Sequence, residues 1–190
     1  MTKHGGTLCS PERSLVVFLD IQEKLIAAVE GKSITHVVNN ASRLLQAAHI
    51  LHVPVLFTEQ YSDRLGGTHP TLLDARPPES RVIEKTSFSA YDNENFRKYL
   101  DLSGRREIIL CGIEAHVCVL QTAFSLLNDG YSVYVVEDAV CSRTEANKLN
   151  GLRRIEQAGG QISNRESVLY EWIRDSQHPN FREIIKQLIR

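Results

Sequence analysis

The sequence predicts a three-layer α/β/α fold of the Rossmann-like type, with a doubly wound, mostly parallel six-stranded sheet. Short apolar runs alternate with longer segments of helical periodicity along the 190 residues. Such alternation is typical of a parallel sheet with helices on both faces. No repeat or linker interrupts it, so we expect one domain over residues 1–190, with a flexible N-terminus over residues 1–12. Right-handed crossovers favour the strand order 3-2-1-4-5-6.

The first strand is SLVVFLD at 14–20, a continuous apolar run that fits a strand buried on both faces. A helical segment follows, is interrupted near Gly31 and resumes over 34–52, ahead of a second strand at 53–59. The remaining elements alternate in the same way, with strands at 81–85, 106–112, 131–138 and 161–163 and helices at 93–102, 115–128, 144–158, 166–175 and 180–188.

Residues 60–80 contain a concentration of loop-forming residues: Gly66, Gly67, Pro70, Pro77 and Pro78. A loop of this length in a compact domain is usually functional. We therefore expect this segment, or a neighbouring subunit, to close the substrate pocket.

Composition and charge exclude several classes of function. The 22 Lys and Arg residues balance 23 Asp and Glu residues, and a net charge of −1 argues against nucleic acid as a partner. No apolar run reaches the roughly 18 residues of a membrane span, and the N-terminus lacks the apolar core of a signal peptide. Four cysteines without a CxxC pair favour a reducing, intracellular compartment. We expect the cytoplasm, with mitochondrial import left open.

The turn after the first strand contains no glycine and reads DIQEK from Asp20 to Lys24. A dinucleotide site would need GxGxxG there, and a phosphate-binding loop would need GxxxxGK[ST]. The sequence therefore predicts no nucleotide cofactor, and the expected partner is a small-molecule substrate.

Three reactive side chains are expected at one edge of the sheet. Asp20 ends the first strand, Lys85 ends the third, and Cys118 follows the fourth at the start of a helix. A helix N-terminus and a nearby ammonium both stabilise a thiolate, a carboxylate can act as general base, and free N–H groups can hold an oxyanion. The combination predicts a thiol-based acyl-transfer hydrolase. Taken singly, each residue also fits a plainer role: a core thiol, a turn aspartate and a solvated lysine.

Three motifs resemble those of the isochorismatase-like cysteine hydrolase superfamily, in particular its isochorismatase domain-containing proteins. They are VVFLDIQEKL around Asp20, VIEKTSFSAY around Lys85 and CGIEAHVCV around Cys118. The resemblance implies a catalytic triad of Asp20, Lys85 and Cys118. It also implies a non-proline cis peptide between Ile113 and Glu114, and an oxyanion hole formed by the backbone N–H groups of Glu114 and Cys118.

Departures from the relatives narrow the chemistry. Nicotinamidases of the superfamily carry a metal-binding Asp-x-His after the second strand, where this chain reads TEQYS from Thr58 to Ser62, so we expect neither zinc nor iron. True isochorismatases do not use a cysteine nucleophile, and Cys118 therefore argues against isochorismate as the substrate. Relatives often assemble, which implies a homo-oligomer.

Four further residues are candidates for substrate contact. Gln22 and Gln60 follow the first two strands and could hydrogen-bond an amide or carboxylate, and Tyr61 and Phe88 could line an apolar slot. Each could equally be a structural residue. His116 lies two positions before Cys118, and residues so spaced do not face each other on a helix, so a Cys–His dyad is less favoured than the triad.

The predicted function is that of a metal-independent cysteine hydrolase. It acts on a small carbonyl substrate and cleaves an amide or related C–N bond through a thioester intermediate. Two alternatives remain: a catalytically silent scaffold that binds a protein or metabolite on the same fold, and a redox-sensing thiol.

Overall fold

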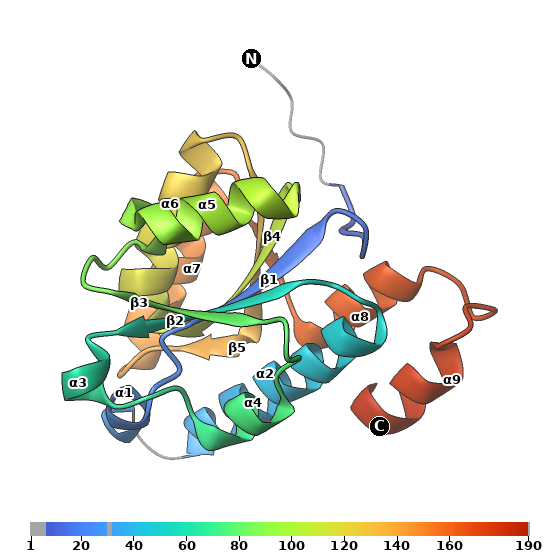
Figure 1. Cartoon of the computed structure of the whole chain (residues 1–190), viewed down its shortest axis with the longest axis horizontal. Helices are drawn as coiled ribbons and strands as arrows, with labels where there is room; N and C mark the ends of the chain where they lie inside the picture. The colour runs from blue at the N-terminus through green and yellow to red at the C-terminus, as the bar shows by residue number, and fades with distance from the viewer. Residues whose placement is uncertain (1–6, 30–31, 190) are drawn as a thin grey trace.

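The computed structural model describes residues 7–29 and 32–189 and contains one six-stranded sheet (Figure 1). The strand order is β3-β2-β1-β4-β5-β6, and every neighbouring pair is parallel, which confirms the predicted doubly wound topology. The strands are β1 (Ser14–Leu19), β2 (Val55–Gln60), β3 (Arg81–Lys85), β4 (Glu107–Ile113), β5 (Ser132–Cys141) and β6 (Gln161–Ser163).

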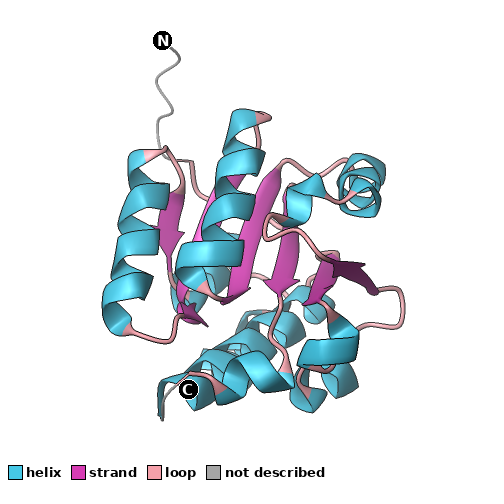
Figure 2. Ribbon diagram, turned by 90° about the vertical axis from the view of Figure 1, so that its left-hand side faces the viewer, coloured by secondary structure: helices cyan, strands magenta, loops and turns pink. Residues whose placement is uncertain are grey.

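Helices cover both faces of the sheet, as Figure 2 shows. One face carries α2 (Lys32–Ile50), α4 (Pro70–Ala75), α8 (Arg165–Ile173), α9 (Phe181–Ile184) and the π-helical turn η3 (Ile185–Ile189). The other carries α5 (Glu94–Ser103), α6 (Leu120–Asn128) and α7 (Glu145–Gln157). Shorter elements at the strand ends are α1 (Glu23–Ala27), α3 (Ser62–Leu65), the 3-10 turn η1 (Ala90–Asp92) and the π-helical turn η2 (Ala115–Val119).

Strand β1 lies at the centre of the sheet and is buried along its whole length. Because successive side chains of a strand point to opposite faces, Leu15 and Val17 enter the core below α5, α6 and α7. Val16 and Phe18 enter the core against α2 and α8, where the Phe18 ring stacks on that of Phe57 with centroids 4.9 Å apart. The central strand is thus held on both sides, which fixes the position of the residue that follows it.

The segment 60–80 differs from the predicted loop because it contains α3 and α4. Pro70 occupies the start of α4, where the backbone N–H that proline lacks would have no partner within the helix. The His69 side chain accepts a hydrogen bond from the Thr71 N–H. A β-bridge between Gln22 and Thr68 ties the segment to the turn after β1. Its proline and glycine residues therefore lie at or near the ends of two short helices and do not form one long loop.

Cys9 and Ser10, near the N-terminus, make contacts with the rest of the fold. Cys9 is fully buried, its N–H donates to Glu171 at 2.8 Å, and the Ser10 N–H donates to Glu107 at 2.8 Å. Hydrogen bonds with helix and strand side chains therefore hold two residues of the segment that is expected to be flexible. Residues 1–6 and the predicted interruption at Gly31 lie outside the described residues.

Candidate active site

Asp20 directly follows β1, at the edge of the sheet where the carboxyl ends of the parallel strands meet. Its backbone has φ = 52°, a left-handed conformation that aspartate tolerates better than most residues. Its N–H donates to the Thr58 carbonyl at 3.1 Å, and its own carbonyl accepts from the Gln22 N–H at 2.8 Å. The site lies where β1 meets β2 and β4, the position at which doubly wound sheets bind ligands.

Lys85 ends β3 and forms a buried ion pair with Asp20. Lys85 Nζ lies 2.7 Å from Asp20 Oδ2, and both side chains are completely inaccessible to solvent. The second carboxylate oxygen, Oδ1, accepts a hydrogen bond from the Thr58 hydroxyl at 2.6 Å. A buried ion pair is tolerated when further hydrogen bonds satisfy its remaining donors and acceptors, and Thr58 serves this purpose for the carboxylate.

The Lys85 ammonium has several further acceptors. It donates to Gln60 Oε1 at 2.7 Å and lies 3.1 and 3.3 Å from the carbonyl oxygens of Ser87 and Phe88. Together with Asp20 Oδ2, these oxygens surround the ammonium and fix its position beside the carboxylate.

Cys118 completes the cluster. It lies in η2, directly after β4, and its Sγ is 3.9 Å from Lys85 Nζ. Burial, followed by the negative charge of Asp20, raises the pKa of the Cys118 thiol to about 12, although Lys85 acts in the opposite direction. The protein at rest thus holds a neutral thiol. This corrects the expectation of a thiolate stabilised by the helix N-terminus and the ammonium, because that argument did not include burial.

The turn that carries Cys118 is fixed by two glycines. Gly112 has φ = 138°, and a Cβ there would lie 2.1 Å from the Leu19 carbonyl oxygen, so only glycine lets β4 approach β1 this closely. A Cβ on Gly151 of α7 would lie 2.7 Å from the Ala115 carbonyl oxygen, so α7 packs directly on η2. The Ile113–Glu114 peptide bond, at the junction of β4 and η2, is cis.

The Glu114 side chain ties this turn to the segment after β5. Glu114 Oε2 accepts from the Arg143 N–H at 2.9 Å and from Nε at 3.2 Å, and Oε1 accepts from Nη2 at 2.8 Å. Burial alone would raise the pKa of Glu114, but the hydrogen bonds from Arg143 outweigh it and lower that pKa. His116 Nδ1 lies 3.0 Å from Ser142 Oγ, in the same segment. Both side chains therefore hold the turn.

Gln22 and Gln60, two of the predicted substrate contacts, make hydrogen bonds within the protein. The Gln22 amide donates to the Gln60 and Gly66 carbonyls and accepts from the Gln60 N–H at 2.7 Å. The Gln60 amide binds Lys85 on one side and the Thr86 carbonyl on the other. Both residues are buried, and the amide oxygen of each already accepts a hydrogen bond.

Tyr61 and Phe88 remain available to a substrate. Their side chains are 49% and 54% exposed. Both are linked to Lys85 through the backbone: the Tyr61 N–H donates to the Lys85 carbonyl at 3.1 Å, and the Phe88 carbonyl faces the ammonium. Backbone hydrogen bonds therefore fix the segments of Tyr61 and Phe88 next to Lys85, while both residues stay exposed to solvent.

Sequence reasoning missed Thr58 and Arg143. Thr58 is paired with Leu19 in the β1–β2 register, one position before Asp20, so an alignment of the predicted strand ends could have found it. Arg143 is 29 residues from Glu114, and no local pattern links the two.

Two features of the described residues bear on cofactors and membranes. Among the described residues, no three His, Cys, Asp or Glu side chains gather in an arrangement that could hold a metal ion. None of the described helices combines the length and apolar character required to cross a bilayer.

Comparison with known proteins defines the class. The model of the isochorismatase domain matches residues 14–167, and the chain belongs to this family. "Isochorismatase domain-containing protein 2" of Danio rerio is 39% identical over 180 residues, which cover 94% of this chain and 88% of that protein. The family and the subgroup suggested by the three motifs are thereby confirmed.

Solved structures share the fold. "MAR1 Ribonuclease from Caenorhabditis elegans" has a TM-score of 0.91 and 35% identity over 97% of this chain and 93% of the other. YcaC from Pseudomonas aeruginosa, described "with hexane-2,5-diol and covalent acrylamide", has a TM-score of 0.90 and 27% identity over 100% and 94%. YcaC from Escherichia coli, described as "an octameric hydrolase of unknown specificity", has a TM-score of 0.86 and 25% identity over 97% of both chains.

Proposed function

We propose that this chain is a single isochorismatase-like domain and a metal-independent cysteine hydrolase that cleaves the C–N bond of a small amide, with Cys118 as nucleophile. One observation carries the proposal: the Cys118 thiol lies 3.9 Å from the ammonium of a buried Lys85–Asp20 ion pair. A thiol, an ammonium and a carboxylate in one desolvated cluster supply a nucleophile, a fixed positive charge and a base.

The reaction begins with transfer of the Cys118 proton to Asp20. A thiol with a raised pKa requires such a base, and Lys85 stabilises the thiolate as it forms. The sulfur then attacks the amide carbonyl, and the N–H groups of Glu114 and Cys118 receive the oxyanion. Collapse of the tetrahedral intermediate breaks the C–N bond, and the proton held by Asp20 goes to the departing nitrogen.

Hydrolysis of the thioester completes the cycle. Asp20 takes a proton from a water molecule, the water oxygen attacks the thioester carbonyl, and the C–S bond breaks. The proton returns to the Cys118 sulfur, which restores the resting thiol. The net reaction consumes one amide and one water and yields a carboxylic acid and an amine or ammonia.

Two observations support a small amide. The Cys118, Lys85 and Asp20 residues are 6%, 2% and 0% exposed, so only a small group reaches the sulfur without movement of the chain. The YcaC structure from P. aeruginosa contains covalent acrylamide, so that relative accommodates a molecule that carries a small primary amide, although acrylamide reacts with thiols at its vinyl carbon.

Hydrolysis of RNA is the second candidate, because the C. elegans relative is named a ribonuclease. The net charge of −1 provides no general attraction for a phosphate backbone, and the buried cluster is inaccessible to a polynucleotide. A non-catalytic scaffold is the third, and a buried ion pair beside a thiol is a costly feature for a protein without chemistry.

Ammonia release from a panel of small primary amides tests the proposal, with a single-stranded RNA oligonucleotide as a separate substrate. We expect turnover of at least one amide by the wild-type protein, none by Cys118→Ala, and no cleavage of RNA. The far-ultraviolet circular dichroism of Cys118→Ala should match that of the wild type. Turnover of an amide by a folded Cys118→Ala variant, or cleavage of RNA without amide turnover, would contradict the proposal.

We propose that the chain forms a homo-oligomer, which the octameric E. coli YcaC supports. Size-exclusion chromatography with light scattering tests it, and a monomer at micromolar concentration would contradict it. Residence in a reducing compartment stays a prediction, and the free state of all four cysteines is consistent with it.

A further inference from the structure

A cavity lies at the opposite end of strand β3 from Lys85 and the Cys118 thiol. It has a volume of about 440 Å³, within the range of small-molecule sites. Arg81 at the start of β3 lines it, whereas Lys85 at the end of the same strand belongs to the cluster. At a rise of about 3.3 Å per residue, the two ends of β3 are roughly 13 Å apart. The cavity is therefore separate from the proposed active site.

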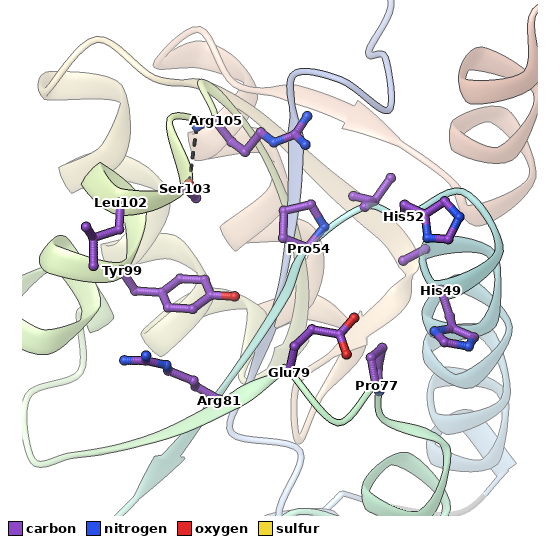
Figure 3. Close-up of a pocket in the computed structure, with 12 residues that line it drawn as sticks. His49, His52, Pro54, Pro77, Glu79, Arg81, Tyr99, Leu102, Ser103 and Arg105 are labelled. Carbon is purple, nitrogen blue, oxygen red and sulfur yellow. Dashed lines mark hydrogen bonds between the residues drawn. The ribbon is translucent and has the colours of Figure 1, made fainter.

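The charged groups of the cavity are positive on balance. Figure 3 shows the Arg105 side chain at the upper edge, Arg81 at the lower edge and the Glu79 carboxylate between them and the histidines. The two guanidinium groups lie on opposite sides of the cavity, and Arg105 Nη1 donates to the Pro11 carbonyl at 2.9 Å. None of the three forms an ion pair with another residue of the described chain, so their charges are not neutralised within the protein. His49 in the last turn of α2 and His52 in the turn after it add two imidazole groups.

The remaining walls are apolar and aromatic. Pro54, Pro77 and Leu102 line the cavity, and Leu102 is 82% exposed. The Tyr99 ring lies beneath the Arg81 guanidinium, whose Cζ is 5.9 Å from the ring centroid, and the Tyr99 hydroxyl is held by the Val55 carbonyl. A fixed aromatic ring between apolar walls accommodates a flat apolar body.

We propose that this cavity binds a small planar organic carboxylate. The carboxylate binds the Arg81 guanidinium, because a guanidinium binds a carboxylate through two parallel hydrogen bonds. The planar body lies against Tyr99 and the prolines. A single inorganic anion would leave most of the volume and all of the apolar wall unused. A metal ion does not fit, because the described residues contain no cluster of three metal-ligating side chains.

Titration of the full chain with 4-fluorobenzoate, followed by fluorine NMR, tests the proposal, with 4-fluorobenzyl alcohol as the neutral control. The benzoate should bind at least tenfold more tightly than the alcohol. Opposite charge changes should have opposite effects: Arg81→Gln should weaken binding, and Glu79→Gln should strengthen it, each on the order of fivefold. Impaired folding could mimic the first effect but not the second.

Arg153→Gln is the matched control, because Arg153 is an exposed arginine on α7 outside the cavity. It should leave the affinity for 4-fluorobenzoate unchanged. Equal binding of the acid and the alcohol would overturn the proposal. So would an affinity that is the same in the wild type, Arg81→Gln and Glu79→Gln, since the benzoate would then be bound elsewhere.

Discussion

The Asp20 carboxylate has two side-chain partners, Lys85 and Thr58. The Thr58 hydroxyl donates to Asp20 Oδ1 at 2.6 Å, and both residues are buried. Thr58→Val preserves the shape of the side chain and removes the donor. We expect a loss of about 1.5–3 kcal/mol in the free energy of unfolding, typical of a hydrogen bond to a charged group.

The same substitution should slow the reaction of Cys118 with acrylamide on the order of tenfold, because the base loses a contact that orients it. Thr58→Ser keeps the hydroxyl and should retain most of both properties. Urea unfolding and adduct formation followed by mass spectrometry measure the two effects. A Thr58→Val protein with wild-type stability and reactivity would show that the contact is unimportant.

The pKa of Cys118 responds to its two charged neighbours in opposite directions. Asp20 raises this pKa and Lys85 lowers it. Asp20→Asn should therefore move the midpoint of the pH profile of Cys118 alkylation to lower pH, while turnover is lost with the base. Lys85→Met should move the midpoint upward. The profile is measured with iodoacetamide and peptide mass spectrometry; a shift of both variants in the same direction would contradict the assignment of the charges.

At the scale of elements, the contact between α7 and η2 determines where the nucleophile lies. Gly151 is a buried residue of helix α7. In a helix interior, Gly→Ala normally stabilises by about 1 kcal/mol. Here the added Cβ would lie 2.7 Å from the Ala115 carbonyl oxygen and 2.9 Å from the His116 Cα, so the helix and the turn must separate.

Gly151→Ala should consequently destabilise the protein by about 1–3 kcal/mol, the usual range for overpacking. It should also reduce the reactivity of Cys118, since the turn that carries it is displaced. Asn150→Ala, at an exposed position one residue earlier in α7, is the control and should be nearly neutral. Thermal unfolding compares the three proteins, and a Gly151→Ala variant that is more stable than the wild type would refute the packing argument.

At the scale of the whole molecule, the buried thiols make stability depend on alkaline pH. Burial is the main cause that raises the pKa of Cys118 and of Cys141 to about 12, whereas an unfolded thiol has a pKa of about 8.5. Below about pH 8.5 both states keep the proton, and the stabilisation is complete. As the pH rises from about 8.5 toward 12, the unfolded chain loses protons that the folded chain retains, so stability falls.

Urea unfolding between about pH 7 and pH 10 measures this dependence. The midpoint should hold steady up to about pH 8.5 and then decline. Cys141→Ala should show a shallower decline, because one of the thiols responsible has been removed. A midpoint that is constant to pH 10, or the same slope in both proteins, would contradict the argument.

The sequence predicts most of the architecture because each strand is a short apolar run between polar turns. It also predicts which residues converge, since Asp20, Lys85 and Cys118 follow parallel strands whose ends share one edge. It cannot predict the pKa of Cys118, which depends on burial by distant segments. Nor can it find the Glu114–Arg143 contact, because these residues are brought together by the β4–β5 register and by no local spacing.

The helices within 60–80 were missed for a different reason. Proline and glycine end helices but also begin and follow them, and Pro70 belongs to the start of α4. The hydrogen bonds of Gln22 and Gln60 could not be predicted from the sequence either, because their partners include backbone groups of segments that only the fold brings together.

Labelling of the protein with acrylamide, resolved for each of the four cysteines by peptide mass spectrometry, tests the central claim most directly. Addition of the Cys118 sulfur to the vinyl carbon leaves the amide intact, so the adduct reports the nucleophile without knowledge of the substrate. We predict an adduct at Cys118 well before Cys9, Cys111 or Cys141, and a much slower reaction in Lys85→Met. Labelling of another cysteine first, or labelling of Cys118 that is indifferent to Lys85, would contradict the account.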